Sequence, residues 1–144
     1  MQSFWYPATL TPEPRGYFTV TFPDFPEAIT SGRNLADALS QAADCLQEAI
    51  AGRIVRKEQI PPPSRLKPGQ RRVRVALYLA PKLALYLAMR QQHVSNTELA
   101  RRLKCSETVV RRMLNPQHDS KPENLQAALQ ALGKQFVVAV ENAA

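Results

Sequence analysis

A proline-rich stretch near the middle of the chain constrains the fold more than any other feature. Residues 61–69 read PPPSRLKPG, so that four prolines and one glycine occupy nine positions. Proline has no backbone N–H and a fixed φ, so this stretch can continue neither a helix nor a central strand. We therefore expect a stiff linker over residues 61–70. The 144 residues divide into two small parts, each near the lower size limit for an independent core.

The part before this stretch has the polarity pattern of a small sheet followed by a helix. Residues 4–10 (FWYPATL) and 17–23 (YFTVTFP) are rich in aromatic and β-branched residues and flank the turn-forming TPEPRG. They predict a β-hairpin, and residues 28–31 predict a short third strand. Apolar residues then recur at helical spacing, with Asn34 suited to cap this helix and Gly52 to close it.

The part after this stretch begins with a further strand pattern. Residues 71–79 (RRVRVALYL) place Val and Leu on one side and mainly Arg on the other, which predicts a fourth strand. The pentapeptide ALYLA recurs at residues 84–88, where it follows Pro81 and predicts a helix. We therefore assign residues 1–60 plus strand 71–79 to an N-terminal domain and residues 81–144 to a C-terminal one.

The most specific motif is SNTELARRLKCSETVVRRMLN at residues 95–115. Ser95 and Glu98 form the S-x-x-E capping box that begins a helix, and Ser106 can cap a second one. Ala100 is small enough for the second helix to cross the first closely. Two short helices joined by a tight turn in this way predict a helix-turn-helix.

The second of these helices presents basic and polar residues to solvent. Arginine can read guanine edges or bind phosphates, and residues 65–144 carry a formal charge of +9 against −2 for residues 1–64. This asymmetry favours double-stranded DNA as the partner of the basic part. The alternative is that the arginines form only a solvated helical surface. The predicted DNA-binding residues are Ser95, Asn96, Thr97, Ser106, Glu107, Thr108, Arg111, Arg112 and Asn115.

Residues 81–133 resemble the Cro/repressor-like helix-turn-helix family. The resemblance includes a later helix, SKPENLQAALQALG, with its own capping box at Ser120 and Glu123 and with Gly133 at its end. Lys104 stands where that family commonly has glycine. Its backbone must therefore adopt φ > 0 at a cost of roughly 1 kcal/mol or turn differently.

The last apolar run is FVVAV at residues 136–140, a short strand pattern without an obvious partner inside a helical domain. We expect two copies of it to pair with each other. The chain is therefore expected to form a homodimer or a higher homo-oligomer.

The N-terminal part also carries a family pattern. Its FPDFPEAITSG segment, the helix NLADALSQAADCLQEAI and the following IPPPS resemble the HicB antitoxin family over residues 6–64. This resemblance implies a partial ribonuclease-H-like fold that binds a small HicA-type mRNA-cleaving toxin and covers its catalytic histidine. It also implies repression of the toxin–antitoxin operon. Our candidates for toxin binding are Tyr17, Asp24, Phe25 and Glu27.

Four carboxylates raise the question of nuclease activity. Asp37, Asp44 and Glu48 share one helical face and Asp24 lies in a loop, whereas ribonuclease H chemistry needs carboxylates that converge on two metals. The positions of these carboxylates favour a solvated helical face, or an acidic surface for a basic toxin, over a metal site. We expect no catalytic residue, metal or cofactor, and no enzymatic activity. Two alternatives stay open: a transcriptional regulator whose N-terminal domain senses a small ligand, and a metal-dependent ribonuclease-H-like nuclease.

The fold class predicted from these patterns is α+β. A small antiparallel sheet with one helix precedes an all-α helix-turn-helix domain that ends in a short strand. The first residues lack a secretory signal pattern, and the longest apolar stretch, residues 75–89, is interrupted by Pro81 and Lys82 and is too short to span a membrane. We expect a cytoplasmic protein without membrane contact, with Cys45 and Cys105 as free thiols.

Overall fold

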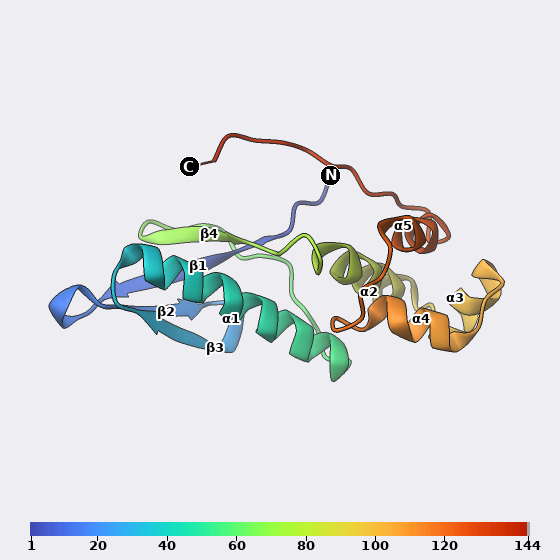
Figure 1. Ribbon diagram of the computed structural model, residues 1–144, viewed down its shortest axis with the longest axis horizontal. Helices are drawn as coiled ribbons and strands as arrows, with labels where there is room; N and C mark the ends of the chain where they lie inside the picture. The colour runs from blue at the N-terminus through green and yellow to red at the C-terminus, as the bar shows by residue number, and fades with distance from the viewer. Residues whose placement is uncertain (144) are drawn as a thin grey trace. The chain divides into compact units, whose positions relative to one another are not determined.

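The computed structural model describes residues 1–143, which form two compact units whose boundary along the chain lies between Ala80 and Pro81. The first unit contains a four-stranded sheet and one long helix, and the second contains short helices (Figure 1). The predicted α+β class is confirmed.

Antiparallel strands make up the sheet of the first unit, in the order β3-β2-β1-β4. The strands are β1 (Trp5–Pro12), β2 (Phe18–Phe22), β3 (Phe25–Gly32) and β4 (Gln70–Arg74), and a short 3₁₀ turn, η1 (Pro14–Gly16), connects the first two. The predicted hairpin is confirmed. The third strand is longer than residues 28–31 because it pairs along the whole of β2.

One face of the sheet is covered by the helix α1 (Leu35–Val55), as Figure 1 shows. The Asn34 side chain caps this helix by accepting a hydrogen bond from the Asp37 N–H at 2.9 Å, as predicted. The prediction that Gly52 ends the helix is wrong. Ile54 is only 5% exposed, and the burial of its side chain extends the helix by one further turn.

The predicted strand 71–79 is also shorter than expected, since β4 ends at Arg74. The Val75 N–H donates to the Phe4 carbonyl at 3.1 Å, beyond which β1 offers no further partner. The buried Gln47 side chain of α1 then takes over: its amide donates to the Arg74 carbonyl at 3.1 Å and accepts from the Ala76 N–H at 2.9 Å. The chain turns at this point, and the first ALYLA copy forms a turn instead of a strand.

The proline-rich stretch does not link the two units but belongs to the first one. The Tyr6 hydroxyl donates to the Pro61 carbonyl at 2.7 Å, and the Asp24 carboxylate accepts from the N–H of Ser64 at 2.9 Å and from its hydroxyl. Ile60 is 5% exposed and packs in the core. The stretch is extended, as its prolines require, but it runs along the surface of the unit.

The boundary between Ala80 and Pro81 gives the two units other net charges than the division at residue 64 used for the sequence. The arginines and the lysine of residues 65–74 fall in the first unit, which carries ten Lys or Arg against seven Asp or Glu, a formal charge of +3. The second unit has nine against five, a formal charge of +4. The expected contrast between an acidic and a basic half therefore does not hold for the folded units.

The second unit contains the helices α2 (Ala80–Gln92), α3 (Asn96–Leu103), α4 (Glu107–Leu114) and α5 (Pro122–Gln130). The helix predicted for the second ALYLA copy is confirmed, because this copy lies inside α2. The buried core is apolar and draws on all four helices and on the segments that follow α2 and α5. Its members are Leu85, Ala88, Met89, Val94, Leu99, Ala100, Val110, Met113, Leu125, Ala128, Leu129 and Leu132.

The C-terminal segment forms no strand in the isolated chain. Residues 134–143 have neither helical nor strand hydrogen bonding, and Val137, Val138 and Val140 are at least 60% exposed. Phe136 packs on the core, and its N–H donates to the Gln126 side chain at 2.9 Å. A strand needs a hydrogen-bonded neighbour, and the described part of this single chain provides none here.

Candidate nucleic-acid interface

The two helices α3 and α4 begin at the predicted caps. The Ser95 hydroxyl accepts a hydrogen bond from the Glu98 N–H at 3.1 Å, and the Ser106 hydroxyl accepts from the Val109 N–H at 3.4 Å. Each serine thereby satisfies one of the free N–H groups of a first helical turn. Val110, on the inner side of α4, is fully buried. The sequence therefore defines both helix starts and the face that each helix buries.

The turn between these helices depends on Lys104, whose backbone is left-handed with φ 55° and ψ 45°. The first of the two expected alternatives therefore holds, with a strain of roughly 1 kcal/mol in a residue that is not glycine. The Cys105 N–H donates back to the Ala100 carbonyl at 3.0 Å and closes α3. The chain reverses within two residues, which allows Ser106 to begin α4 directly.

Five of the nine predicted DNA-binding residues make contacts inside the unit. Ser95 and Ser106 are the helix caps described above. The Thr97 hydroxyl donates to the Glu107 carboxylate and links the first turns of α3 and α4. The Asn115 side chain accepts from the Gln117 N–H at 3.0 Å in the turn after α4. These five side chains position the helices.

The other four predicted residues are Asn96, Thr108, Arg111 and Arg112. Their side chains form no hydrogen bond or ion pair with any part of the chain that the structure describes. Thr108, Arg111 and Arg112 are exposed on α4. The two guanidinium groups of α4 are therefore available to an external anion.

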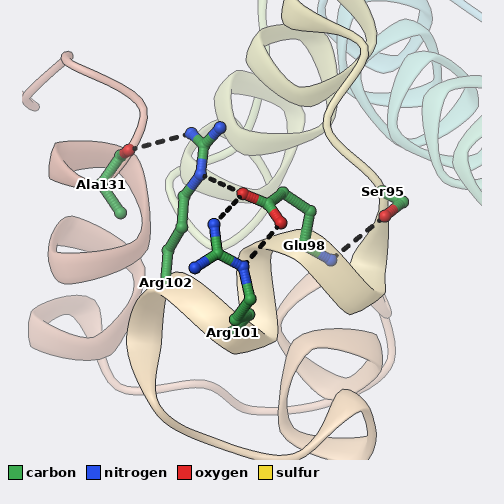
Figure 2. A network of polar contacts seen from close by, with 5 residues as sticks. All are labelled: Ser95, Glu98, Arg101, Arg102 and Ala131. Carbon is green, nitrogen blue, oxygen red and sulfur yellow. Dashed lines mark hydrogen bonds and ion pairs between the residues drawn. The ribbon is translucent and has the colours of Figure 1, made fainter.

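A second arginine pair, Arg101 and Arg102 on α3, does have a carboxylate partner inside the unit. The Glu98 carboxylate accepts from Arg101 at 2.6 and 2.9 Å and from Arg102 at 3.0 Å, and Arg102 also reaches the Ala131 carbonyl at 3.5 Å (Figure 2). Hydrogen bonds from both guanidinium groups lower the pKa of Glu98 to about 2. A single carboxylate thus offsets half of the formal charge of this pair and engages both guanidinium groups.

The structure also contains a polar residue that the motif did not identify. Lys82 of α2 is only 2% exposed, and its ammonium group donates to the Arg112 carbonyl, the Met113 carbonyl and the Ser120 hydroxyl. In the sequence its signal is a lysine within the apolar stretch 75–89.

Ser120 was expected to cap the last helix together with Glu123, and this prediction is wrong. Lys121 is the N-cap of α5 and makes no side-chain cap bond, while Pro122 occupies the first turn. The Ser120 hydroxyl instead takes part in the contacts of Lys82. The glycine predicted at the end of this helix does adopt a positive φ, 75° at Gly133.

Comparison with known proteins identifies the family. A model of the HicB-like antitoxins of bacterial toxin–antitoxin systems matches residues 5–84. The chain is 38% identical to antitoxin HicB of Escherichia coli K12 over 131 residues, which cover 91% of this chain and 95% of that protein. The chain belongs to the HicB antitoxin family. Another HicB relative is antitoxin HicB 1 of Photorhabdus laumondii, which is 33% identical over 94% of this chain and 86% of that protein. Antitoxin HicB of Pseudomonas fluorescens is 31% identical over 97% of this chain and 96% of that protein.

In this HicB family member, three of the four residues expected to bind toxin have structural contacts. Phe25 is 0% exposed, lies edge-on to the Tyr6 ring at 4.8 Å and has the Arg53 guanidinium over its face, so that its ring belongs to the core. Glu27 forms two hydrogen bonds of 2.7 Å with Arg53, which lowers the pKa of Glu27. Asp24 holds the proline-rich stretch. Tyr17 is 44% exposed and is open to a partner.

The acidic residues of the first unit do not converge on a common point that could hold a metal ion. Among residues 1–143, no group of three or more His, Cys, Asp or Glu side chains is arranged to hold a metal ion. Asp44 and Glu48 lie exposed on α1, and Asp37 accepts from the Arg33 N–H at the start of that helix. Within the same described residues, no helix combines the length and the apolar character needed to cross a membrane.

We predict that Glu98→Gln destabilises the second unit in a pH-dependent way. The folded-state pKa of Glu98 lies below its ordinary value of 4.5, so its contribution is complete above about pH 4.5 and is lost as pH falls toward about 2. In thermal unfolding followed by circular dichroism, the variant should have a lower Tm at pH 7, and the difference should vanish near pH 2. Because these groups are solvent-exposed, added salt should reduce the difference. A Tm difference that is the same at every pH would contradict this assignment.

Proposed function

We propose that this HicB family member neutralises a HicA-type toxin through its first unit and represses its own operon through the second, in which α3 and α4 act as a helix-turn-helix on double-stranded DNA. The observation that carries the DNA-binding part is the contrast between two arginine pairs. Arg101 and Arg102 form ion pairs with Glu98, whereas Arg111 and Arg112 are exposed and have no carboxylate partner among residues 1–143.

The dimensions and charges of α4 support its role as the recognition helix. An α-helix with its side chains is about 10–12 Å in diameter and therefore fits the major groove, which is about 12 Å wide. Arginine forms two parallel hydrogen bonds with guanine or with a phosphate. Arg111 and Arg112 can do so without breaking an existing ion pair, so that no internal interaction has to be given up on binding.

The toxin-binding part rests on family membership, since the relatives named above are antitoxins. Within the first unit, Tyr17 is the candidate that the fold leaves open, directly before β2. An exposed aromatic ring has a large apolar surface and a hydroxyl group, a combination that is frequent at protein interfaces.

A homodimer would complete the repressor. The exposed valines of residues 136–140 have unpaired backbone groups beside an apolar face, and a second copy can supply the missing strand. Two helix-turn-helix units related by a two-fold axis bind half-sites about 34 Å apart.

We predict that Arg111→Ala and Arg112→Ala each weaken binding to the DNA upstream of the operon. Loss of an arginine–guanine contact should cost about 1–3 kcal/mol, or roughly 5- to 150-fold in Kd, and should reduce the preference over a scrambled duplex. If an arginine contacts phosphate instead, affinity should fall for all duplexes and the salt dependence should decrease by about one ion. Fluorescence anisotropy with labelled duplexes at several salt concentrations measures both effects.

Arg101→Ala is the matched control for this experiment. It removes the same charge from the neighbouring helix, but from an arginine that Glu98 already compensates. Its effect on Kd should be clearly smaller than that of Arg111→Ala. Equal Kd values for Arg111→Ala, Arg112→Ala and the unsubstituted chain would refute the assignment of α4.

We predict that the chain co-purifies with the small protein encoded next to it in the operon and that Tyr17→Ala weakens this complex. Truncation of an aromatic side chain at an interface should raise Kd by about fivefold or more. Val55→Ala, at an exposed apolar residue of α1, is the control and should change Kd little. Calorimetry measures both. A Kd that Tyr17→Ala leaves unchanged would exclude Tyr17 from the interface, and failure of the two proteins to bind would refute the toxin-binding part.

We predict that Val138→Asp converts a dimer into a monomer. Val138 is 91% exposed in the single chain, so a charge there should not disturb the fold, whereas in a pair of strands it would face an apolar neighbour. Light scattering coupled to gel filtration measures the mass, with Gln135→Ala as a control near the same segment. A variant that stays dimeric, or a chain ending at Gly133 that does so, would contradict pairing through this segment.

A further inference from the structure

The lysine buried beneath α4 uses every hydrogen-bond donor that it has. The Lys82 ammonium group donates to the Arg112 carbonyl at 3.1 Å, the Met113 carbonyl at 2.9 Å and the Ser120 hydroxyl at 2.8 Å. An ammonium group has three N–H donors, so none is left without an acceptor. The group reaches these acceptors from α2, at least 30 residues away in sequence.

Two of the acceptors are backbone carbonyls in the last turn of α4. The last carbonyls of a helix lack the usual partner four residues ahead and carry its partial negative charge, so a cation is favourable there. The Arg112 carbonyl also accepts from the Asn115 N–H at 3.2 Å. The Ser120 hydroxyl in turn donates to the Arg112 carbonyl at 3.3 Å and thereby joins the segment before α5 to the same turn. Burial holds the pKa of Lys82 below its ordinary value, and the negative charge of the nearby Asp119 offsets only part of this shift.

This site lies directly behind the residues proposed to contact DNA. Arg111 and Arg112 project outward from the turn whose inner carbonyls bind Lys82. The other contacts of α4 with its unit are mainly apolar, such as those of Val110 and Met113. Apolar contacts are not directional and allow a helix of eight residues to rotate or slide, whereas the two hydrogen bonds from Lys82 to the Arg112 and Met113 carbonyls are directional and hold its last turn in one orientation.

We propose that Lys82 is a positioning residue for DNA recognition, which orients α4 so that Arg111 and Arg112 face the base edges. This inference rests on the proposed function, because it assumes that α4 enters DNA. The ammonium group also contributes to the stability of the unit, because its removal takes a donor from the Arg112 and Met113 carbonyls. Its distinctive effect is on the specificity of DNA binding.

The test compares Lys82→Met with the unsubstituted chain on two duplexes, the operon's upstream DNA and a scrambled sequence of equal length. Methionine keeps the length and volume of the side chain but removes the three donors. We expect affinity for the upstream DNA to fall by about tenfold, within the range for losing one arginine–base contact, and affinity for the scrambled duplex to stay nearly constant. Lys67→Met is the matched control, since it removes the same charge from an exposed lysine of the first unit.

Two further measurements separate positioning from stability. All affinities are measured well below the Tm of the least stable variant, as determined by circular dichroism. In a chain that already carries Arg111→Ala and Arg112→Ala, Lys82→Met should have little further effect, because the residues it orients are gone. If Lys82→Met does not fold, Ser120→Ala removes one of the three acceptors and should lower the preference for the upstream DNA in the same direction but to a smaller degree.

The outcomes distinguish this inference from the function on which it rests. If the unsubstituted chain has no preference for the upstream DNA, or Arg111→Ala and Arg112→Ala do not affect it, both the function and the inference are refuted. If the arginine variants lose the preference but Lys82→Met, or Ser120→Ala in its place, lowers only the Tm, Lys82 is structural and this inference alone is refuted. The inference is also refuted if Lys82→Met lowers affinity by the same factor in the Arg111→Ala and Arg112→Ala chain as it does in the unsubstituted chain.

Discussion

The backbone groups at the ends of short elements must find partners, and the structure depends on the few side chains that supply them. In α4 the last carbonyls are satisfied from the inside by the Lys82 ammonium group. At the end of β4 the Gln47 amide serves both the Arg74 carbonyl and the Ala76 N–H. An unpaired buried polar group costs about 1–3 kcal/mol, a large fraction of the stability of a unit of this size. Such side chains therefore determine where the elements end.

The same principle explains the course of the proline-rich stretch. Prolines cannot donate, so this segment is unable to join the sheet as a strand, yet its carbonyls and its Ser64 remain able to bond. The Tyr6 hydroxyl, which is mostly buried and whose pKa is raised to about 12, stays protonated at neutral pH and donates to Pro61. Asp24 binds Ser64. A segment that looks like a linker in the sequence is thereby held on the first unit.

Local features of the fold could be predicted from the sequence because their causes are local. Asn34, Ser95 and Ser106 cap helices through side chains that bond the N–H three residues ahead, and each does so in the structure. The same holds for the hairpin, since alternation and the turn between its strands both lie within adjacent residues. At Lys104 the sequence left two alternatives, a left-handed backbone or a different turn, and the structure has the first.

The predictions that were wrong failed because contacts between elements distant in sequence decide those features. Nothing in residues 71–79 indicates that β1 provides a pairing partner only as far as Phe4, or that a glutamine of α1 ends the strand. The S-x-x-E pattern at Ser120 is as good as the one at Ser95, but a buried lysine from another helix uses the serine hydroxyl. Phe25 and Tyr17 are both aromatic residues beside β2, and only the packing of α1 and Arg53 places one in the core and leaves the other exposed.

The candidate site shows why residue type alone does not identify a binding surface. The second unit contains the dipeptide Arg-Arg twice, once on α3 and once on α4, with similar exposure to solvent. Both pairs follow a glutamate by about one turn, but only Glu98 forms ion pairs with its arginines, and these reduce the ability of the α3 pair to attract a polyanion. On α4 the corresponding acidic residue, Glu107, instead accepts from Thr97 and is four residues before Arg111 without pairing with it. Since Thr97 lies on α3, the contact between the two helices leaves the guanidinium groups of α4 uncompensated, and the proposed DNA-binding surface is a consequence of how the helices pack.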